Sequence, residues 1–381
     1  MVIINANIVS ADETWERGYI RYDGATIVEV GSMDTYQAGN DQELDVNGAL
    51  VTPGMIDVHI HGGYNVDTMD ADEDRLRYLA HSMFAEGVTS FFATTITQSS
   101  EAITDALRVT RSVIESGDTS LVGIHLEGPF VNVENAGAQP VEHIIDPDAQ
   151  QFRAWQDLAG GHIRLVTYAP ERPGARELEQ VMLETGAIGS TGHTNATFAE
   201  NKEANVKHGT HLYNQMRGVH HREPGTVGYC LLERDVMAEI IPDGIHSRHE
   251  MVDFAYRLKG VDGLVVITDA MRAKGLPNGR YELGGQPVIV EDGAARLEAG
   301  NLAGSVLTMD AAFRNMLAFT GCTLQEAVKM TSTNQAREFG LTKKGAILSG
   351  FDADFVVWDE ALTVMKTIHQ GKIAYSKEDM K

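Results

Sequence analysis

Two histidines spaced two residues apart are the first residues of the chain that suggest chemistry. His59 and His61 end the apolar stretch "PGMIDVHIHGG", residues 53–63. Side chains two positions apart on a strand point to the same face, so both imidazoles can reach one metal ion. Histidines also end many strands without binding a metal. The pair alone therefore does not decide between a ligand role and a structural one.

Four more metal-binding or proton-transferring residues end apolar, strand-like segments. They are Glu127 in "LVGIHLEG", His193 in "AIGSTGHT", His211 in "GTHLYN" and Asp269 in "GLVVITDA". Imidazole and carboxylate groups together suit a divalent transition metal such as Zn, Fe, Co or Mn. No lysine ends a central strand, so a modified-lysine bridge between two metals is not indicated.

Each of these residues also has a plainer, structural explanation. Glu127 could form a buried salt bridge, and Asp269 could cap the following helix. His193 and His211 could be hydrogen-bonded core histidines. Recurrence of such residues at the ends of several strands favours one shared site. His125 lies two residues before Glu127 on the same strand, and we expect it to be structural.

The elements that must position these residues alternate between strands and helices. Helical patterns occupy residues 72–87, 176–186 and 249–260, and each ends in a glycine typical of a helix C-terminus. The apolar strand candidates are 55–62, 88–95, 121–128, 163–170, 187–194, 209–214, 236–244 and 263–270. Eight strand–helix units predict an α/β fold, a (β/α)8 TIM barrel, whose active site lies at the C-terminal ends of the strands. All six residues would then open on one barrel mouth.

Both ends of the chain are rich in short strands and turns. The Asp-Gly pair in "RYDGATIVEV" is a strong hairpin signal, and "ILSGFDADFVVWD" near the C-terminus has the same character. We therefore predict a small β-sandwich domain built from both termini, residues 1–49 plus 346–381. Residues 50–345 would form the metal-dependent barrel hydrolase domain, with a β insert near 279–301.

Charge and composition exclude several classes of partner. The 381 residues carry a formal net charge of −23, which argues against binding nucleic acid or an anionic membrane surface. An anionic substrate would need a local cationic pocket. The chain has two cysteines without a CxxC motif, no secretory signal, and no apolar run near the ~18 residues of a membrane helix. We expect a soluble cytoplasmic protein.

A metal at the barrel mouth would make hydrolysis possible. A bound metal ion lowers the pKa of its water and supplies hydroxide near pH 7. Asp269, in "VITDA", is the candidate to take the proton from that water and then give it to the leaving group. The residues therefore predict a metal-dependent hydrolase.

Motifs along nearly the whole chain resemble one family. In order they are "HLEGPF" (125–130), "STGHTNAT" (190–197), "THLYNQM" (210–216), "REPG" (222–225), "VITDAM" (266–271) and "LAGSVLTMD" (302–310). Together with "PGMIDVHIHGG" and "GAILSGFDADFVVWD", they resemble the N-acetylglucosamine-6-phosphate deacetylases of the amidohydrolase superfamily. The resemblance implies hydrolysis of a linear amide: N-acetyl-D-glucosamine 6-phosphate gives D-glucosamine 6-phosphate and acetate, in amino-sugar catabolism and recycling.

The resemblance also implies a role for individual residues. Glu127, His193 and His211 match the ligands of the principal metal. His59 and His61 match a second-metal pair that some members lack, so one or two ions per subunit are expected. Asp269 matches the catalytic acid/base. The matching substrate-binding positions are Ala138, Gln139, Asn214, Gln215, Arg222, His246, Leu302, Ala303 and Gly304.

Two features of the substrate positions need comment. Arg222 and His246 would neutralise the 6-phosphate, and a guanidinium fits phosphate geometry well; the alternative for Arg222 alone is a surface ion pair. In the family this arginine can come from the neighbouring subunit, which implies a homodimer. Many members have a histidine where this chain has Gln139, and glutamine can hydrogen-bond but cannot titrate. His143 lies close by in sequence.

Two other functions compete with this hypothesis. The chain could be another amidohydrolase, such as a cyclic-amide hydrolase or a deaminase, but a phosphate pocket from Arg222 and His246 would serve no purpose there. It could also be a metal-bearing scaffold without catalysis. The presence of Asp269 beside a full ligand set argues against the scaffold.

Overall fold

The chain divides into two compact units. The computed structural model describes residues 1–380. The first unit comprises residues 1–57, 81–90 and 309 to the end of the described chain, and the second comprises 58–80 and 91–308. The domain boundaries expected at residues 49 and 346 remain a prediction. Every candidate site residue belongs to the second unit.

The predicted barrel is confirmed. Its eight strands follow one another in the sheet in chain order, with parallel pairing from β9 to β15. They are β6 (Met55–Ile60), β9 (Val88–Thr94), β10 (Leu121–Glu127), β11 (Ile163–Tyr168), β12 (Ile188–Thr191), β13 (His208–Gly209), β14 (Met237–Ile240) and β15 (Leu264–Val266).

Contacts between the first strand and the chain after the last strand close the ring. Ile60 forms a parallel bridge with Ala270. The backbone N–H of His61 donates to Ala270 O at 2.9 Å, and that of Asp269 donates to His59 O at 2.8 Å. Because β6 and the segment after β15 meet here, closure brings Asp269 next to His59 and His61, which precede it by more than 200 positions in the chain.

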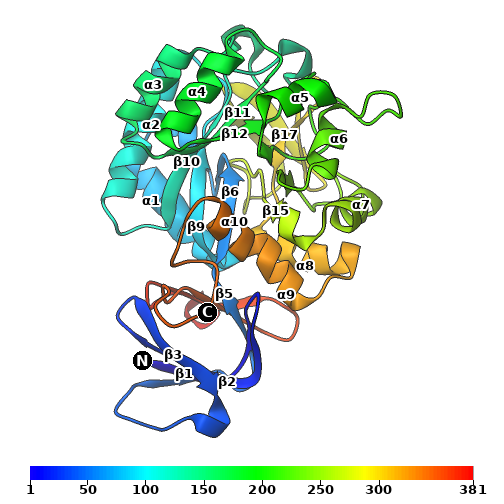
Figure 1. Cartoon of the computed structure of the whole chain (residues 1–381). Helices are drawn as coiled ribbons and strands as arrows, with labels where there is room; N and C mark the ends of the chain where they lie inside the picture. The colour runs from blue at the N-terminus through cyan, green and yellow to red at the C-terminus, as the bar shows by residue number, and fades with distance from the viewer. Residues whose placement is uncertain (381) are drawn as a thin grey trace. The chain divides into compact units, whose positions relative to one another are not determined.

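Amphipathic helices surround the strands of the second unit (Figure 1). In α2 the buried residues Ile103, Ala106, Leu107, Thr110 and Val113 follow the helical period, so one face packs inward. Glycines in the left-handed conformation end the short 3-10 helix η3 (Met83–Glu86) and α4, at Gly87 and Gly186. The helices are α1 (Glu73–Ser82), α2 (Ser100–Glu115), α3 (Ala149–Leu158), α4 (Ala175–Thr185), α5 (Phe198–Ala204), α6 (Gly225–Leu232) and α7 (His249–Lys259).

The first unit contains a sheet built from both termini, as expected. Its path runs β22-β21-β20-β5-β1-β2-β3, and β4 pairs with β1. Ile3, Val51, Phe355 and Ile368 are fully buried in its core. The strands are β1 (Val2–Val9), β2 (Thr14–Asp23), β3 (Thr26–Ser32), β4 (Glu43–Asp45), β5 (Leu50–Pro53), β20 (Phe355–Trp358), β21 (Val364–His369) and β22 (Lys372–Ser376). Helices α8 (Met309–Thr320), α9 (Leu324–Val328) and α10 (Asn334–Glu338) also belong to this unit.

A four-stranded antiparallel insert follows β15. It consists of β16 (Gly279–Leu283), β17 (Gln286–Glu291), β18 (Ala294–Leu297) and β19 (Leu302–Ser305). Its buried face forms an apolar cluster with Ile96 and Met271, residues that follow β9 and β15. A two-stranded ribbon, β7 (Gly62–Gly63) with β8 (Val66–Asp67), follows β6. The insert thus packs beside the C-terminal ends of the barrel strands.

Candidate active site

Several site residues lie just beyond the barrel strands rather than inside them. β12 ends at Thr191, β13 at Gly209 and β15 at Val266, so these strands are shorter than the sequence predicts. The reason is backbone geometry. His193, His211 and Asp269 have φ angles of 48°, 32° and 49°, in the left-handed region that ends an extended strand.

Hydrogen bonds hold these uncommon conformations in place. The N–H of Asn132 donates to His193 O at 2.9 Å, and the N–H of Ser305 donates to Asp269 O at 2.7 Å. Left-handed residues other than glycine persist only where the surroundings fix them, and they concentrate at functional sites. The backbone at these strand ends therefore sets the direction of the His193, His211 and Asp269 side chains, and residue types alone do not reveal this.

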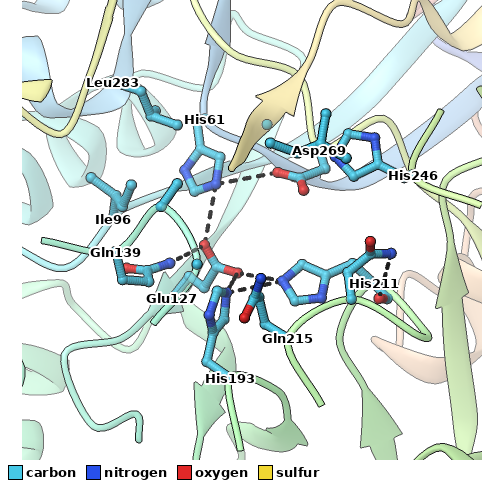
Figure 2. A pocket seen from close by; sticks show the side chains of 15 residues that line it. His61, Ile96, Glu127, Gln139, His193, His211, Gln215, His246, Asp269 and Leu283 are labelled. Atoms are coloured by element: carbon cyan, nitrogen blue, oxygen red, sulfur yellow. Dashed lines mark hydrogen bonds and ion pairs between the residues drawn. The ribbon is translucent and has the colours of Figure 1, made fainter. Parts of the chain in front are cut away.

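Glu127 lies at the centre of the candidate site (Figure 2). Its Oε1 is 3.3 Å from His193 Nε2 and 3.2 Å from His211 Nε2, and these two nitrogens are 3.1 Å apart. Its Oε2 is 3.2 Å from His61 Nε2. All four side chains are at most 6% exposed. The structure thus brings together the ligands that the family resemblance implies for the principal metal.

A second group adjoins the first. Asp269 Oδ1 is 3.4 Å from His59 Nε2 and 3.3 Å from His61 Nε2. In each group the candidate ligand atoms lie within 4.8 Å of one another, so each group is compact enough to hold one ion. The two groups are Glu127 with His193 and His211, and Asp269 with His59 and His61; a third compact group, His59 with His125 and Glu239, shares His59 with the second.

The protonation pattern of His193 fits a metal ligand. Its Nδ1 is 2.9 Å from the backbone carbonyl of Asn135, which can only accept. Nδ1 must therefore carry the proton, and Nε2 of the neutral ring presents a lone pair to the Glu127 carboxylate and to His211. Lone pairs and a carboxylate converging on one buried point need a cation between them, so the donor set fits a divalent metal.

The electrostatics of the pocket agree with this fit. Burial alone would lower the pKa of His59, but the charges of Glu239, Asp269 and Glu127 raise it to about 9. Burial would likewise raise the pKa of Glu127, yet His59 and the hydrogen bonds from the other histidines hold it well below its usual range. The buried carboxylates thus draw positive charge into the pocket.

Two buried residues beneath the site were not predicted. Glu239 on β14 and His208 on β13 are both 0% exposed, and Glu239 contacts His59 and His208. A charged residue in the otherwise apolar strand "VMAEIIP" was a usable signal, because burying a charge is costly unless it is paired. His125 is also fully buried, and its Nε2 is 2.7 Å from Thr167 Oγ1, which agrees with a structural role.

A cavity of about 140 Å³ opens beside the cluster. The apolar side chains of Ile96 and Leu283 form part of its wall (Figure 2). Seven of the nine predicted substrate-binding residues line it: Ala138, Gln139, Asn214, Gln215, His246, Leu302 and Gly304. Ala303 does not line it, because it is fully buried in the apolar cluster of the insert.

Arg222 stands apart from the cavity of its own chain. It is exposed in a short hairpin closed by the bridge between His220 and Glu223, ahead of α6. The guanidinium contacts His221 Nε2 at 2.8 Å. Within one chain, the described structure therefore does not bring Arg222 and His246 together at the cavity.

His246 does face the cavity, with a carboxylate behind it. Its Nδ1 is 2.6 Å from Asp243 Oδ2. Burial alone would lower the pKa of His246, but the hydrogen bond and charge of Asp243 raise it. The ring can therefore carry a positive charge toward an anionic group in the cavity.

Gln139 uses both ends of its amide inside the protein. Its Nε2 donates to Glu127 Oε2 at 2.9 Å, and its Oε1 accepts from the backbone N–H of Thr97 at 2.9 Å. The side chain is 4% exposed. The sequence predicted a substrate contact here, and the structure adds a second task, since Gln139 orients the central carboxylate.

The barrel mouth, its buried histidines and its carboxylates place the chain in a class of metal-dependent hydrolases. A profile of the amidohydrolase family matches residues 50–381, and the chain belongs to this family. The family is metal-dependent, and the two ligand groups agree with that.

Three relatives within the family share one enzyme name. N-acetylglucosamine-6-phosphate deacetylase of Lysinibacillus sphaericus is 45% identical over 98% of this chain and 97% of its own. The Bacillus subtilis enzyme of the same name is 41% identical over 99% and 98%. A solved structure of a Mycobacterium smegmatis N-acetyl-D-glucosamine-6-phosphate deacetylase variant in complex with N-acetyl-D-glucosamine-6-phosphate has a TM-score of 0.93 at 30% identity, covering 99% of both chains. Among the described residues, no helix has both the length and the apolar character needed to cross a membrane.

Proposed function

We propose that this chain hydrolyses the N-acetyl group of N-acetyl-D-glucosamine 6-phosphate to give D-glucosamine 6-phosphate and acetate. The observation that carries the proposal is the convergence of Glu127, His193, His211 and Asp269 on one cavity lined by predicted substrate positions. The names of relatives that match nearly the whole chain support the same reaction.

Each of the two ligand groups would hold one metal ion. Glu127, His193 and His211 would hold the principal ion, and His59, His61 and Asp269 surround the place for a second. A bound divalent metal supplies Lewis acidity, which acidifies a water and polarises a carbonyl. The donor set accepts Zn, Fe, Co or Mn.

Asp269 would move the proton during hydrolysis. Burial alone would raise the pKa of its carboxyl group, but His59 and His61 lower it, so the group is ionised and able to accept a proton at neutral pH. It takes the proton of the attacking water while the new C–O bond forms at the acetyl carbon. It then gives that proton to the amine nitrogen as the C–N bond breaks.

The phosphate would be bound by residues from two chains. His246 lies in the cavity wall and carries positive charge readily, as its pKa shift indicates. Arg222 is exposed on a hairpin and does not line its own cavity, which supports a homodimer in which it completes the site of the neighbouring subunit. The cytoplasmic location predicted from the cysteines stays a prediction.

The alternative, another amidohydrolase acting on a cyclic amide or a nucleobase, makes different predictions. Its substrates lack a phosphate, so His246 would face no anionic group of the substrate in the cavity. The buried and positively biased His246 therefore favours the phosphorylated sugar.

The decisive assay measures metal content per chain and acetate release together. Protein loaded with Zn, Fe or Co should deacetylate N-acetyl-D-glucosamine 6-phosphate, and should act much more slowly on the same sugar without phosphate. Asp269→Asn should reduce kcat by about 10²–10⁴-fold. Loaded protein that leaves the phosphorylated sugar intact would refute the proposal, and unchanged activity of Asp269→Asn would refute the mechanism.

A further inference from the structure

Beneath the two ligand groups lies a carboxylate that touches both of them. Glu239 on β14 is 0% exposed, and its two oxygens accept three N–H groups. Oε2 is 2.9 Å from His59 Nδ1 and accepts from the backbone N–H of His211 at 2.9 Å. Oε1 is 3.1 Å from His208 Nε2. All three neighbours are also buried.

The bond to His59 fixes which ring nitrogen faces the metal. An ionised carboxylate can only accept, so Nδ1 of His59 carries the proton. Nε2 is then the nitrogen left to bind a metal once the ring is neutral, and it lies 3.4 Å from Asp269 Oδ1 and 3.6 Å from Glu127 Oε1. A carboxylate behind a metal-binding histidine also raises the basicity of that histidine.

The bond to His211 acts on the backbone instead. His211 has a φ angle of 32°, which a residue with a Cβ atom adopts only when its surroundings hold it there. Its N–H is tied to Glu239, while its carbonyl accepts the N–H of Asn214 at 3.0 Å. This conformation places His211 Nε2 at 3.2 Å from Glu127.

We infer that Glu239 is a positioning residue that sets both ligand groups at once: it orients His59 through its side chain and His211 through its backbone. The inference rests on the proposed function only in that these groups hold metal. It predicts that metal affinity, rather than only turnover, depends on Glu239.

Two substitutions separate the effect of the negative charge of Glu239 from the effect of its hydrogen bonds. In Glu239→Gln the amide oxygen can keep the His59 and His211 bonds, while the amide N–H₂ replaces the oxygen that faces His208. The negative charge behind His59 and the acceptor for His208 are lost, and Co²⁺ affinity should fall about 10-fold. Glu239→Leu removes the acceptor from all three donors, and affinity should fall about 100-fold or one ion per chain should be lost.

The experiment titrates metal-free protein with Co²⁺ against a chelator, without substrate, and measures bound ions per chain. A matched control is Glu86→Gln, since Glu86 is 2% exposed, accepts the Met309 N–H and belongs to the first unit, which contains none of the ligand residues. The control should bind Co²⁺ as the wild type does. If Glu239→Leu fails to fold, Glu239→Gln still decides.

A double variant tests whether the effect passes through His59. Glu239→Gln combined with His59→Asn should bind Co²⁺ no more weakly than His59→Asn alone, because the two changes remove one interaction. Additive losses, or wild-type Co²⁺ affinity in Glu239→Gln, would overturn the inference. Because binding is measured without substrate, failure of the deacetylation assay would leave this result standing, and the converse also holds.

Discussion

Gln139 gives the sharpest test of how the central carboxylate is held. The substitution Gln139→Leu removes the donor to Glu127 Oε2 and the acceptor for the Thr97 N–H, two bonds of 2.9 Å in a side chain that is 4% exposed. Leucine has a similar size and can stay buried at this position. The change therefore acts on the hydrogen bonds more than on the volume.

The size of the effect follows from two independent estimates. A hydrogen bond to a charged group contributes about 1.5–3 kcal/mol. Loss of an outer partner of a metal ligand typically costs about 10–100-fold in affinity, which is about 1.4–2.7 kcal/mol. The estimates agree, so Gln139→Leu should bind Zn²⁺ or Co²⁺ about 10–100-fold more weakly than the wild type.

The substitution Gln139→Glu tests the same contact by placing a second carboxylate beside Glu127. Two carboxylates about 3 Å apart repel by about 5–6 kcal/mol at an effective dielectric constant near 20, so the pair retains a proton at neutral pH. Metal binding must expel this proton. The affinity of the variant should therefore rise with pH by an extra factor of up to about ten per unit, as one released proton requires.

The assay is a Co²⁺ titration in competition with a chelator between pH 6 and pH 8. Gln215 supplies matched controls, since it lines the same cavity but makes no hydrogen bond to Glu127. Gln215→Leu and Gln215→Glu should show neither the affinity loss nor the extra proton. Wild-type affinity in Gln139→Leu, together with an unchanged pH slope in Gln139→Glu, would show that Gln139 does not position Glu127.

Three further predictions follow from other parts of the structure. His246→Asn should raise KM for the phosphorylated sugar more than it lowers kcat, since His246 lines the cavity without joining either ligand group; steady-state kinetics check this. Removing metal with a chelator should lower the unfolding temperature, because an ion bound at 100 times its Kd stabilises by about 2.7 kcal/mol; an unchanged calorimetric transition would contradict metal binding. In the first unit, Asp354→Asn should destabilise by about 1.5–3 kcal/mol in urea titrations, because it weakens a charge-assisted bond to Lys344 Nζ, which lies 2.6 Å from Asp354 in a partly buried pair and also contacts Asp352. Burial alone would raise the pKa of Asp354, but His369 and Lys344 lower it, so its stabilising effect is present above the unfolded-state pKa and disappears as the pH falls through the folded one.

Local patterns were sufficient for the fold, and they indicated the six candidate metal-binding and proton-transferring residues, whose roles stay predictions. Alternating apolar segments predicted the barrel, and the rule that active sites lie at the C-terminal strand ends located the mouth. The two-residue spacing of His59 and His61 is a property of one strand, so it could be read directly. Glu127 and Asp269 could be placed with them because parallel strands of one barrel end at the same edge.

Other features depend on tertiary contacts that no local pattern contains. The strands end early at His193 and His211 because the backbone turns left-handed there, and hydrogen bonds from distant residues hold that turn. The two hydrogen bonds of the Gln139 side chain connect Thr97 to Glu127, so they link three separate segments of the chain. A glycine would have indicated such a left-handed turn in the sequence, whereas a histidine does not.

The buried charges explain why this site and its metal belong together. Glu127, Asp269 and Glu239 are at most 6% exposed, and taking one unpaired carboxylate out of water costs several kcal/mol. Neutral imidazoles do not offset that cost, since their lone pairs face the same point as the carboxylate oxygens. Protonated histidines can, and the raised pKa of His59 reflects this. A divalent cation offsets the same charge while leaving the imidazoles neutral. Metal binding and proton loss from the histidines should therefore be coupled, and affinity should rise with pH until the rings are deprotonated.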